Sequence, residues 1–578
     1  MTTAATPETV QRPLRALRSR LRRADLPVMV LLLVLFVGAL SIAPLLRLAQ
    51  TALFPEGGFD LARIADLLAT PRVRTATLNT LWISLAATLL ATALGTAAAL
   101  LVALTDMRAR TAWIFGFVLP LMIPPQVMAL AWIQSLSPAS PLLAPLGLTL
   151  APGTRHPLFS AWGIVLLLGL YNAPLVFLTV RATLRRLPAD LIEAARAGGA
   201  RPRQVLATII LPLARGGICA GAALAFVSAI GNFGIQAMLG IPARVPTLIT
   251  LIYRQMNSYG TAALADLALL ALLLAGITVL GMALAGWLGR RSDQRVEGAA
   301  RPIRFALGSA RPLVEILAWG FLALTLLLPV SALVGSSLVS GYGQALTAET
   351  FTLAHYHNAL FAHEGIRSAF ATSLGLTLAA VAILAPVSVA LGYVLVWRPG
   401  PVTRLLHLAS ELAYALPGII IGIAMILFFL RPIGGISLYG TVWIILAAYL
   451  SNFLALALRP VLGGFAQLNR NLDEAAQVAG AGLFARLRDI VLPMLAPSVA
   501  AGSILVFMSA LNEIQVSILL VTSRAQTIGP MIIFLEEAGS STLAAAVGCL
   551  MLALVLALML ASLAFGRRLP DGVLPWRD

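Results

Sequence analysis

The chain has 578 residues, of which 60% are hydrophobic and only 11% are charged, and its mean hydropathy is +0.93. This composition excludes a soluble globular protein and is typical of a protein with several membrane spans. The net charge of +17 comes from arginine, since the 40 basic residues include no lysine, which excludes the phosphate-binding loop that ends in Gly-Lys-Ser/Thr.

Apolar runs of about 20 residues, long enough to cross a bilayer, occur twelve times and predict an all-α membrane protein with twelve transmembrane helices. In chain order, the predicted spans are 26–50, 77–104, 112–134, 159–180, 208–238, 265–288, 313–339, 370–397, 405–430, 439–463, 495–520 and 543–566. The first run is too long for a cleaved signal peptide, so we expect it to remain as a span.

Arginine is distributed unequally between the two sides that this pattern defines. With the N-terminus inside, the inner segments and adjoining span ends hold 30 arginines and the outer ones hold 10. The positive-inside rule therefore predicts that both termini are cytoplasmic.

Two polar segments in different halves of the chain are near copies of each other. Glu193-Ala194-Ala195 is followed by Gly199 and by a Leu-Pro pair that ends at Pro212, and Glu474 begins the same pattern with the same spacing. We call the separation from Glu193 to Glu474 the repeat offset. The segments follow the fourth and tenth predicted spans, so both are expected in the cytoplasm.

Each half then has six spans, and this even number predicts a parallel rather than an inverted repeat. We expect a first half at 1–295, a cytoplasmic linker at 296–312 and a second half at 313–578.

The repeated segments, 188–212 and 469–493, are predicted to form a short helix, a glycine turn and a second short helix. Gly199 and Gly480 can adopt the left-handed conformation that ends a helix, and Pro202 can open the next helix. Asn471 lies three residues before Glu474, which is capping-box spacing. An amphipathic helix on the membrane surface is the alternative, but it does not explain why the spacing occurs twice.

This pattern resembles the Glu-Ala-Ala loop of permease subunits of binding-protein-dependent ABC importers, and the resemblance covers nearly the whole chain. It implies the type I ABC importer permease fold, in the bacterial inner membrane, with a fused permease domain in each half. The loops would be coupling loops that dock into two copies of a cytoplasmic ATP-binding subunit, while a periplasmic binding protein delivers the solute. The expected contact residues are Glu193, Ala194, Ala195, Gly199, Glu474, Ala475, Ala476 and Gly480. The resemblance implies no enzymatic activity, cofactor or nucleic-acid partner for this chain.

The text from Gly231-Asn232-Phe233-Gly234 onward further resembles permeases of ferric-iron importers. Ferric iron is therefore the expected solute, and thiamine, 2-aminoethylphosphonate and polyamines are the alternatives that similar fused permeases carry.

Ionisable groups inside spans are candidates for a translocation path, because burying them in hydrocarbon is costly. Glu411 and Glu513 are the two that stand out, and Asn232 matches Glu513 at the repeat offset. The alternatives are a paired or hydrated glutamate near the outer interface for Glu513 and a structural role for Glu411. Three histidines in one outer segment, beginning at His355, permit a metal site, although contact with a binding protein is the favoured interpretation.

A twelve-span secondary transporter is the main rival class. It predicts an Asp-Arg-Gly-Arg-type loop between spans two and three, but the loop here, 105–110, lacks the glycine. It also leaves the two Glu-Ala-Ala segments unexplained.

Overall fold

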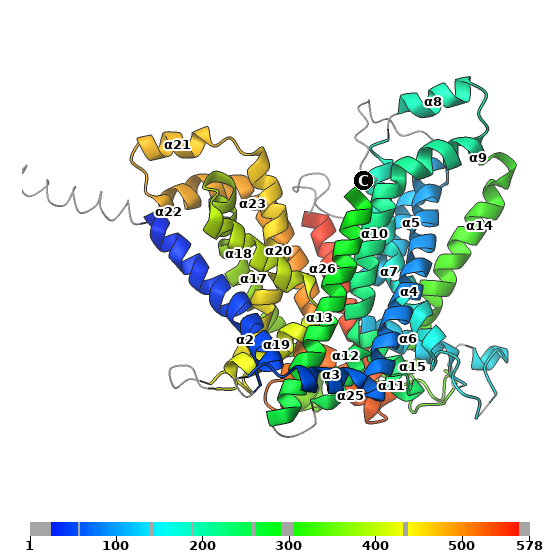
Figure 1. The fold of residues 1–578 in the computed structure, drawn as a ribbon. Coiled ribbons are helices and arrows are strands. Elements are labelled where there is room, and N and C mark those ends of the chain that lie inside the picture. The colour runs from blue at the N-terminus through cyan, green and yellow to red at the C-terminus, as the bar shows by residue number, and fades with distance from the viewer. Residues whose placement is uncertain are drawn as a thin grey trace, which may run out of the picture.

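The computed structural model describes residues 25–55, 58–138, 140, 143–151, 153–187, 189–256, 261–290, 305–431 and 437–565. Within these ranges the chain is a bundle of helices, and its extended pairings are limited to isolated bridges such as Thr105 with Phe305. Figure 1 shows two short helices, α8 (Ala189–Ala197) and α21 (Asn471–Val478), at one end of the bundle. At the opposite end lie α3 (Leu61–Ala69), α11 (Phe233–Ala243), α12 (Leu248–Gln255) and α25 (Ile528–Glu537).

Ten predicted spans correspond to unbroken apolar helices. These are Asp25–Leu53, Pro71–Leu104, Ala161–Leu184, Pro202–Gly231, Ala263–Leu284, Gly308–Ser337, Glu364–Trp397, Val442–Gln467, Leu483–Leu511 and Ser541–Leu560. The predictions at 112–134 and 405–430 correspond to helix pairs bent by 106° and 113°. With each of these pairs counted as one span, all twelve predicted spans are present.

Proline accounts for the two bends. The first bent pair joins α5 (Arg110–Val118) through a 3-10 turn to α6 (Pro125–Leu136), and the second joins α18 (Pro401–Ala415) to α19 (Gly418–Phe429). Pro124 and Pro417 precede the second helix of each pair in extended conformations, and proline cannot continue a helix ladder because it has no N–H. A third bent pair, α11 (Phe233–Ala243) and α12 (Leu248–Gln255), turns by 80° and was not predicted.

The two halves repeat with an offset that changes along the chain. Helices α4 (Pro71–Leu104) and α17 (Glu364–Trp397) both have 34 residues and are equivalent, but their separation in the sequence exceeds the repeat offset, which relates α10 (Leu211–Gly231) to α23 (Leu492–Leu511). The difference arises where α6 leads to α7 (Ala161–Leu184). This connection, 137–160, is longer than the connection 430–441 from α19 to α20 (Val442–Gln467).

The first helix of each half packs against the other half. The helix Asp25–Leu53, which ends in α2 (Ala43–Leu53), packs on α19 and on α13 (Thr261–Arg290). In the second half, α14 (Arg311–Leu322) contacts α5, and α15 (Leu328–Ser337) contacts α6 and α26 (Ser541–Phe565). We call this arrangement, in which the first helix of each half packs on the other half, the exchange of the first helices. Two hydrogen bonds belong to it: Ser41 Oγ lies 3.0 Å from Ser451 Oγ, and Trp113 Nε1 donates to the Ala318 carbonyl at 3.0 Å.

The small residues repeated in α10 and α23 pack within their own halves. Ala220-Gly221 recurs as Ala501-Gly502 at the repeat offset, and such small residues predict that these two helices pair across the pseudo-two-fold axis. This prediction is wrong, because α10 packs mainly on α4, α7 and α13, and α23 packs mainly on α17 and α20. A Cβ on Gly221 would come within 2.9 Å of Val176 Cα on α7, and one on Gly502 within 2.7 Å of the Ala457 carbonyl on α20. Glycine there permits close helix approach, as small residues do in membrane bundles, but the partner is the neighbouring helix of the same half.

The end of the predicted linker is fastened to the first half. Phe305 N–H donates to the Leu104 carbonyl at 2.7 Å, and Leu307 N–H donates to Asp106 Oδ1 at 2.9 Å. Arg311 forms an ion pair with the same aspartate. The hydrogen bond from Leu307 and the charge of Arg311 hold the pKa of Asp106 below its ordinary value. This carboxylate therefore remains charged until the pH falls below the pKa of an ordinary carboxyl group. The remainder of the predicted linker, 296–304, lies outside the described residues.

The exchanged first helix makes a covalent test possible. In a variant with Cys219 and Cys549 replaced by serine, we expect Ser41→Cys with Ser451→Cys to form a disulfide, because the two hydroxyl oxygens are already in contact. After cleavage at a protease site inserted in 296–304, the two halves should stay joined on a non-reducing gel and separate on reduction. Either single cysteine variant is the control. Separation of the double variant without reductant would contradict the exchange.

Candidate coupling loops and axial cluster

The two repeated loops have nearly the same backbone. In the first, α8 (Ala189–Ala197) ends at Gly199 with φ +83°, and Ala200 N–H donates to the Ala195 carbonyl at 3.0 Å. In the second, α21 (Asn471–Val478) ends at Gly480, also with φ +83°, and the matching bond is 2.9 Å. The predicted left-handed glycine turns are therefore confirmed. Only glycine adopts this conformation readily, so the turn fixes the shape of both loops.

Two local predictions have different outcomes. Pro202 does open the next short helix, α9 (Pro202–Val205). The capping-box interpretation of Asn471 is wrong, because this residue begins α21, and its N–H donates to the side chain of Asn469 at 3.0 Å. Asn469 therefore provides the side-chain oxygen before the helix, a role for which asparagine is well suited.

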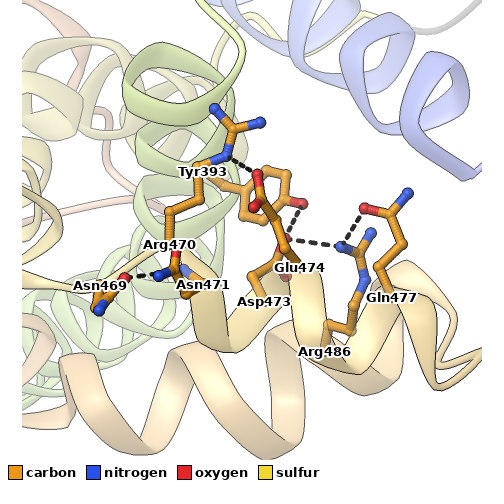
Figure 2. A network of polar contacts seen from close by, with 8 residues as sticks. All are labelled: Tyr393, Asn469, Arg470, Asn471, Asp473, Glu474, Gln477 and Arg486. Atoms are coloured by element: carbon orange, nitrogen blue, oxygen red, sulfur yellow. Dashed lines mark hydrogen bonds and ion pairs between the residues drawn. The ribbon is translucent and has the colours of Figure 1, made fainter.

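A buried ion pair lies beneath the second loop (Figure 2). Arg486 Nη1 donates to Asp473 Oδ2 at 2.7 Å, and Tyr393 Oη donates to the same oxygen at 3.0 Å. The arginine also reaches Gln477 Oε1 at 3.3 Å. Side chains of both charged residues are at least nine-tenths buried. The network thus ties α21 to α22 (Leu483–Arg486) and to α17.

The first loop has an apolar contact in the same place. At the repeat offset, Ile192 corresponds to Asp473 and Val205 corresponds to Arg486. Leu100 on α4 corresponds to Tyr393 on α17 by the larger separation that relates these two helices. Ile192 and Val205 are buried in one hydrophobic cluster, and Leu100 packs against it. Sequence reasoning missed the polar network, although the mismatch between Ile192 and Asp473 inside an otherwise matched repeat is the signal that could have revealed it.

Asn232 and Glu513 cap helices that follow the two repeated spans. Asn232 Oδ1 accepts from Ile235 N–H at 3.0 Å at the start of α11. The Glu513 carboxylate accepts from Val516 N–H and from Ser517 N–H, the latter at 3.0 Å, at the start of α24 (Ser517–Leu520). Both side chains are buried. These caps explain why the predicted spans 208–238 and 495–520 stop at Gly231 and Leu511: the chain turns there, and its next apolar residues form separate short helices.

The ends of α10 and α23 meet the bends of the bent pairs. Asn512 Nδ2 donates to the Met122 carbonyl of the opposite half at 3.0 Å, and Gln515 Oε1 accepts from Gly418 N–H of its own half at 2.9 Å. Gly231, the repeat counterpart of Asn512, lies against the bend of the opposite half, since a Cβ on it would be 3.5 Å from Pro417. We call Met122, Gly231, Pro417, Asn512 and Gln515 the axial cluster. It joins the halves where their helices reach the pseudo-two-fold axis.

A further amide lies beside this cluster. Gln126, at the start of α6, is fully buried, and within the described residues neither of its side-chain polar atoms has a hydrogen-bond partner. A Cβ on Gly234 would approach Gln126 N to 2.8 Å. An amide that is buried without a hydrogen-bond partner is costly. Packing of the helices alone therefore does not account for Gln126 at this position.

Glu411 is held in an ion pair rather than directed alone at a path. Arg459 Nη2 lies 2.7 Å from Glu411 Oε2, and the guanidinium lies 4.6 Å from the centre of the Tyr414 ring. In the first half, Val118 is equivalent to Glu411, Leu178 to Arg459 and Leu121 to Tyr414, so the ion pair is absent from these positions. The structure therefore gives Glu411 a charged partner within its own half.

The histidines of the outer segment serve local structure. His363 Nδ1 accepts from Ile366 N–H at 3.2 Å at the start of α17, and His355 Nε2 lies 2.9 Å from the Val339 carbonyl. Among the residues that the structure describes, no group of three or more His, Cys, Asp or Glu side chains is arranged to hold a metal ion.

A family model described as "Binding-protein-dependent transport system inner membrane component" matches this chain twice, at residues 91–298 and 386–570. The chain belongs to this family. The first match includes two of the bent pairs and the second match includes one, and each match includes one Glu-Ala-Ala loop and one side of the axial cluster. The chain is therefore a multi-pass membrane component of an ABC transporter with two fused permease domains, as the repeat predicted.

Some relatives match most of this chain, and others match less than half of it. "Probable ABC transporter permease protein y4fN" of Sinorhizobium fredii is 27% identical over 92% of this chain and 94% of its own length. "Fe(3+)-transport system permease protein FbpB 2" of Haemophilus influenzae is 25% identical over 87% of this chain and 91% of its own. "Putative 2-aminoethylphosphonate transport system permease protein PhnV" of Salmonella paratyphi A is 27% identical over 40% of this chain and 86% of its own.

The first half provides the control for the buried ion pair. Replacing either Asp473 or Arg486 alone should destabilise the protein by about 3–5 kcal/mol, because the remaining charge stays buried without its partner. The triple change Asp473→Ile, Arg486→Val and Tyr393→Leu copies the first half and should restore most of this loss. Thermal unfolding in detergent measures the difference. A triple variant as unstable as the single variants would show that the two loop cores are not interchangeable.

Proposed function

We propose that this chain forms the translocation path of an ABC importer that takes up ferric iron delivered by a periplasmic binding protein. Two copies of a separate ATP-binding subunit would drive it, one on each coupling loop. The observation that carries the proposal is the pair of loops with the same glycine turn and the same hydrogen bonds at one end of the bundle (Figure 1). Two docking points of one shape suit two copies of one partner.

The orientation follows from the same loops. We place the α8/α21 end, with both chain termini, in the cytoplasm, where ATP is available, and the α3/α25 end in the periplasm of a bacterial inner membrane. The arginine asymmetry favours this direction. The halves would be 1–295 and 313–578, joined by the cytoplasmic linker at 296–312.

The axial cluster supports a gate in this path. It joins the halves where the ends of α10 and α23 reach the bends of α18–α19 and α5–α6, toward the proposed periplasmic side. Few groups hold it: two side-chain hydrogen bonds to backbone atoms and the contact of Gly231 with Pro417. Motion of the two coupling loops, carried by α10 and α23, would separate these contacts and let the solute pass.

Ferric iron is the preferred solute because a relative named for Fe(3+) transport matches both halves of the chain. The relative named for 2-aminoethylphosphonate transport matches only 40% of it. 2-Aminoethylphosphonate therefore remains the second candidate, and thiamine and polyamines follow from the sequence resemblance alone. Uptake of each solute by cells that express the complete transporter would decide between them.

The coupling role predicts a specific defect. Glu193→Arg together with Glu474→Arg should stop ATP-driven uptake, because each glutamate is exposed on the small helix where the ATP-binding subunit would dock. Both helices are remote from the axial cluster, so insertion into the membrane should be normal. Arg404→Glu, a charge reversal at an exposed residue near the start of α18 and outside both loops, is the control and should have no effect. Solute-stimulated ATP hydrolysis that survives the double change would refute coupling through these loops.

The path role of Glu513 is a separate prediction. If its carboxylate compensates the charge of ferric iron, Glu513→Gln should reduce uptake more than it reduces the amount of bound ATP-binding subunit. The amide can still accept one of the two N–H bonds, so the helix cap is partly kept. Asn232→Asp makes the opposite change at the equivalent cap: it keeps an oxygen for the Ile235 N–H and adds a carboxylate, so the same charge argument predicts that it does not reduce uptake. Unchanged uptake in Glu513→Gln would leave the cap as the only role of this residue.

A further inference from the structure

The coupling loops share a backbone but not a surface. Residues 185–208 contain five arginines and two acidic residues, whereas the corresponding residues 466–489 contain three of each. In the first set all five arginines are exposed. In the second, one arginine belongs to the buried pair with Asp473, which adds no charge to the surface.

The exposed charges of the second loop neutralise one another. Arg470 Nε lies 2.9 Å from Glu474 Oε1, and Arg488 Nε lies 3.6 Å from Asp489 Oδ1. At the position of Arg470 the first loop has alanine, and at the positions of Arg488 and Asp489 it has alanine and threonine. The first loop therefore presents a net positive surface, and the second presents a neutral one.

Apolar side chains take the place of this charge on the second loop. Val478 is 89% exposed and Phe484 is 76% exposed. Their counterparts at the repeat offset are Ala197 and Arg203. The helix after the glycine turn thus carries a guanidinium in one loop and an aromatic ring in the other. These two side chains lie on either side of the Gly480 turn, where a partner that covers them would remove apolar surface from water.

We infer that the two loops dock by different chemistry: the first binds an acidic surface of its ATP-binding subunit through arginine, and the second binds its subunit through apolar contact. This inference rests on the proposed function, because it takes the ATP-binding subunit as the occupant of both loops. The equal glycine turns fix an equal shape, so the two copies meet the same backbone. The difference lies in how salt affects each contact.

The two kinds of contact respond differently to salt concentration. Raising ionic strength from about 0.1 M to about 1 M shortens the Debye length from roughly 10 Å to roughly 3 Å and screens exposed charge pairs. Apolar contact does not weaken under these conditions. In the wild-type complex, one of the two bound copies should therefore leave as KCl rises, and the other should stay.

The chain supplies matched variants for the test. Arg201→Gly with Arg203→Phe copies Gly482 and Phe484 into the first loop and leaves Arg196, which lies over the Phe305 ring, unchanged. Val478→Ala with Phe484→Arg copies the first loop into the second. Arg404→Ala, an exposed arginine at the start of α18, is the control for charge outside the loops. All four loop positions are exposed, so these variants should fold.

The experiment counts copies of the ATP-binding subunit on the full chain in nanodiscs as KCl rises from about 0.1 M to about 1 M. We expect two copies to become one for wild type and for Arg404→Ala. Two copies should remain for Arg201→Gly/Arg203→Phe, and none should remain for Val478→Ala/Phe484→Arg. Parallel loss or parallel retention of both copies by wild type, or the same salt response in all variants, would overturn the inference while leaving the proposed function intact. Failure of wild type to bind the subunit even at low salt would instead refute the proposed function.

Discussion

Two side-chain caps determine how the bundle closes. Asn232 and Glu513 bind the N–H groups of the helices that follow them, and these bonds end the long spans at the pseudo-two-fold axis. Inside a membrane no water is available to accept a hydrogen bond from a free backbone N–H. A helix can therefore end there only where another group, such as a side chain, replaces its backbone hydrogen bonds. The turns then bring Asn512 and Gln515 to the bends of the opposite and the same half. The contact between halves at the axial cluster thus depends on two residues that set where the chain turns.

Hydrophobic length and arginine distribution were sufficient to predict the spans, because both are local properties of the sequence. The Glu-Ala-Ala loops were predictable as well, since Gly199 and Gly480 must adopt a conformation that other residues avoid. The bent pairs were not predictable as bends: an apolar run such as 405–430 has the same composition whether it crosses the membrane or turns at Pro417. The packing of Gly221 against α7 was also out of reach, because a small residue permits a close approach without specifying the partner.

Charge is placed in opposite ways in the two loops. The first has arginines outside and Ile192 and Val205 inside, whereas the second has Asp473 and Arg486 inside and Phe484 outside. A buried ion pair gives little net stability over an apolar core of the same shape, so stability alone does not account for the difference. Fusion of the halves accounts for how it can persist. In a dimer of identical subunits both loops would be the same, whereas here each loop has its own stretch of sequence and can adapt to its own neighbours.

The exchanged first helix has a consequence for biogenesis. Ser41 and its contact Ser451 are 410 residues apart in the chain, and translation adds about 5–20 residues per second. The first helix therefore spends roughly 20–80 seconds in the membrane before its final neighbours have been made. During that interval the part of its buried face that does not pack on α13, on a helix whose buried residues include Leu33 and Val37, must be covered by lipid or by the insertion machinery. Correct assembly thus requires the first helix to enter early and to complete its packing only after α19 and α20 have been inserted.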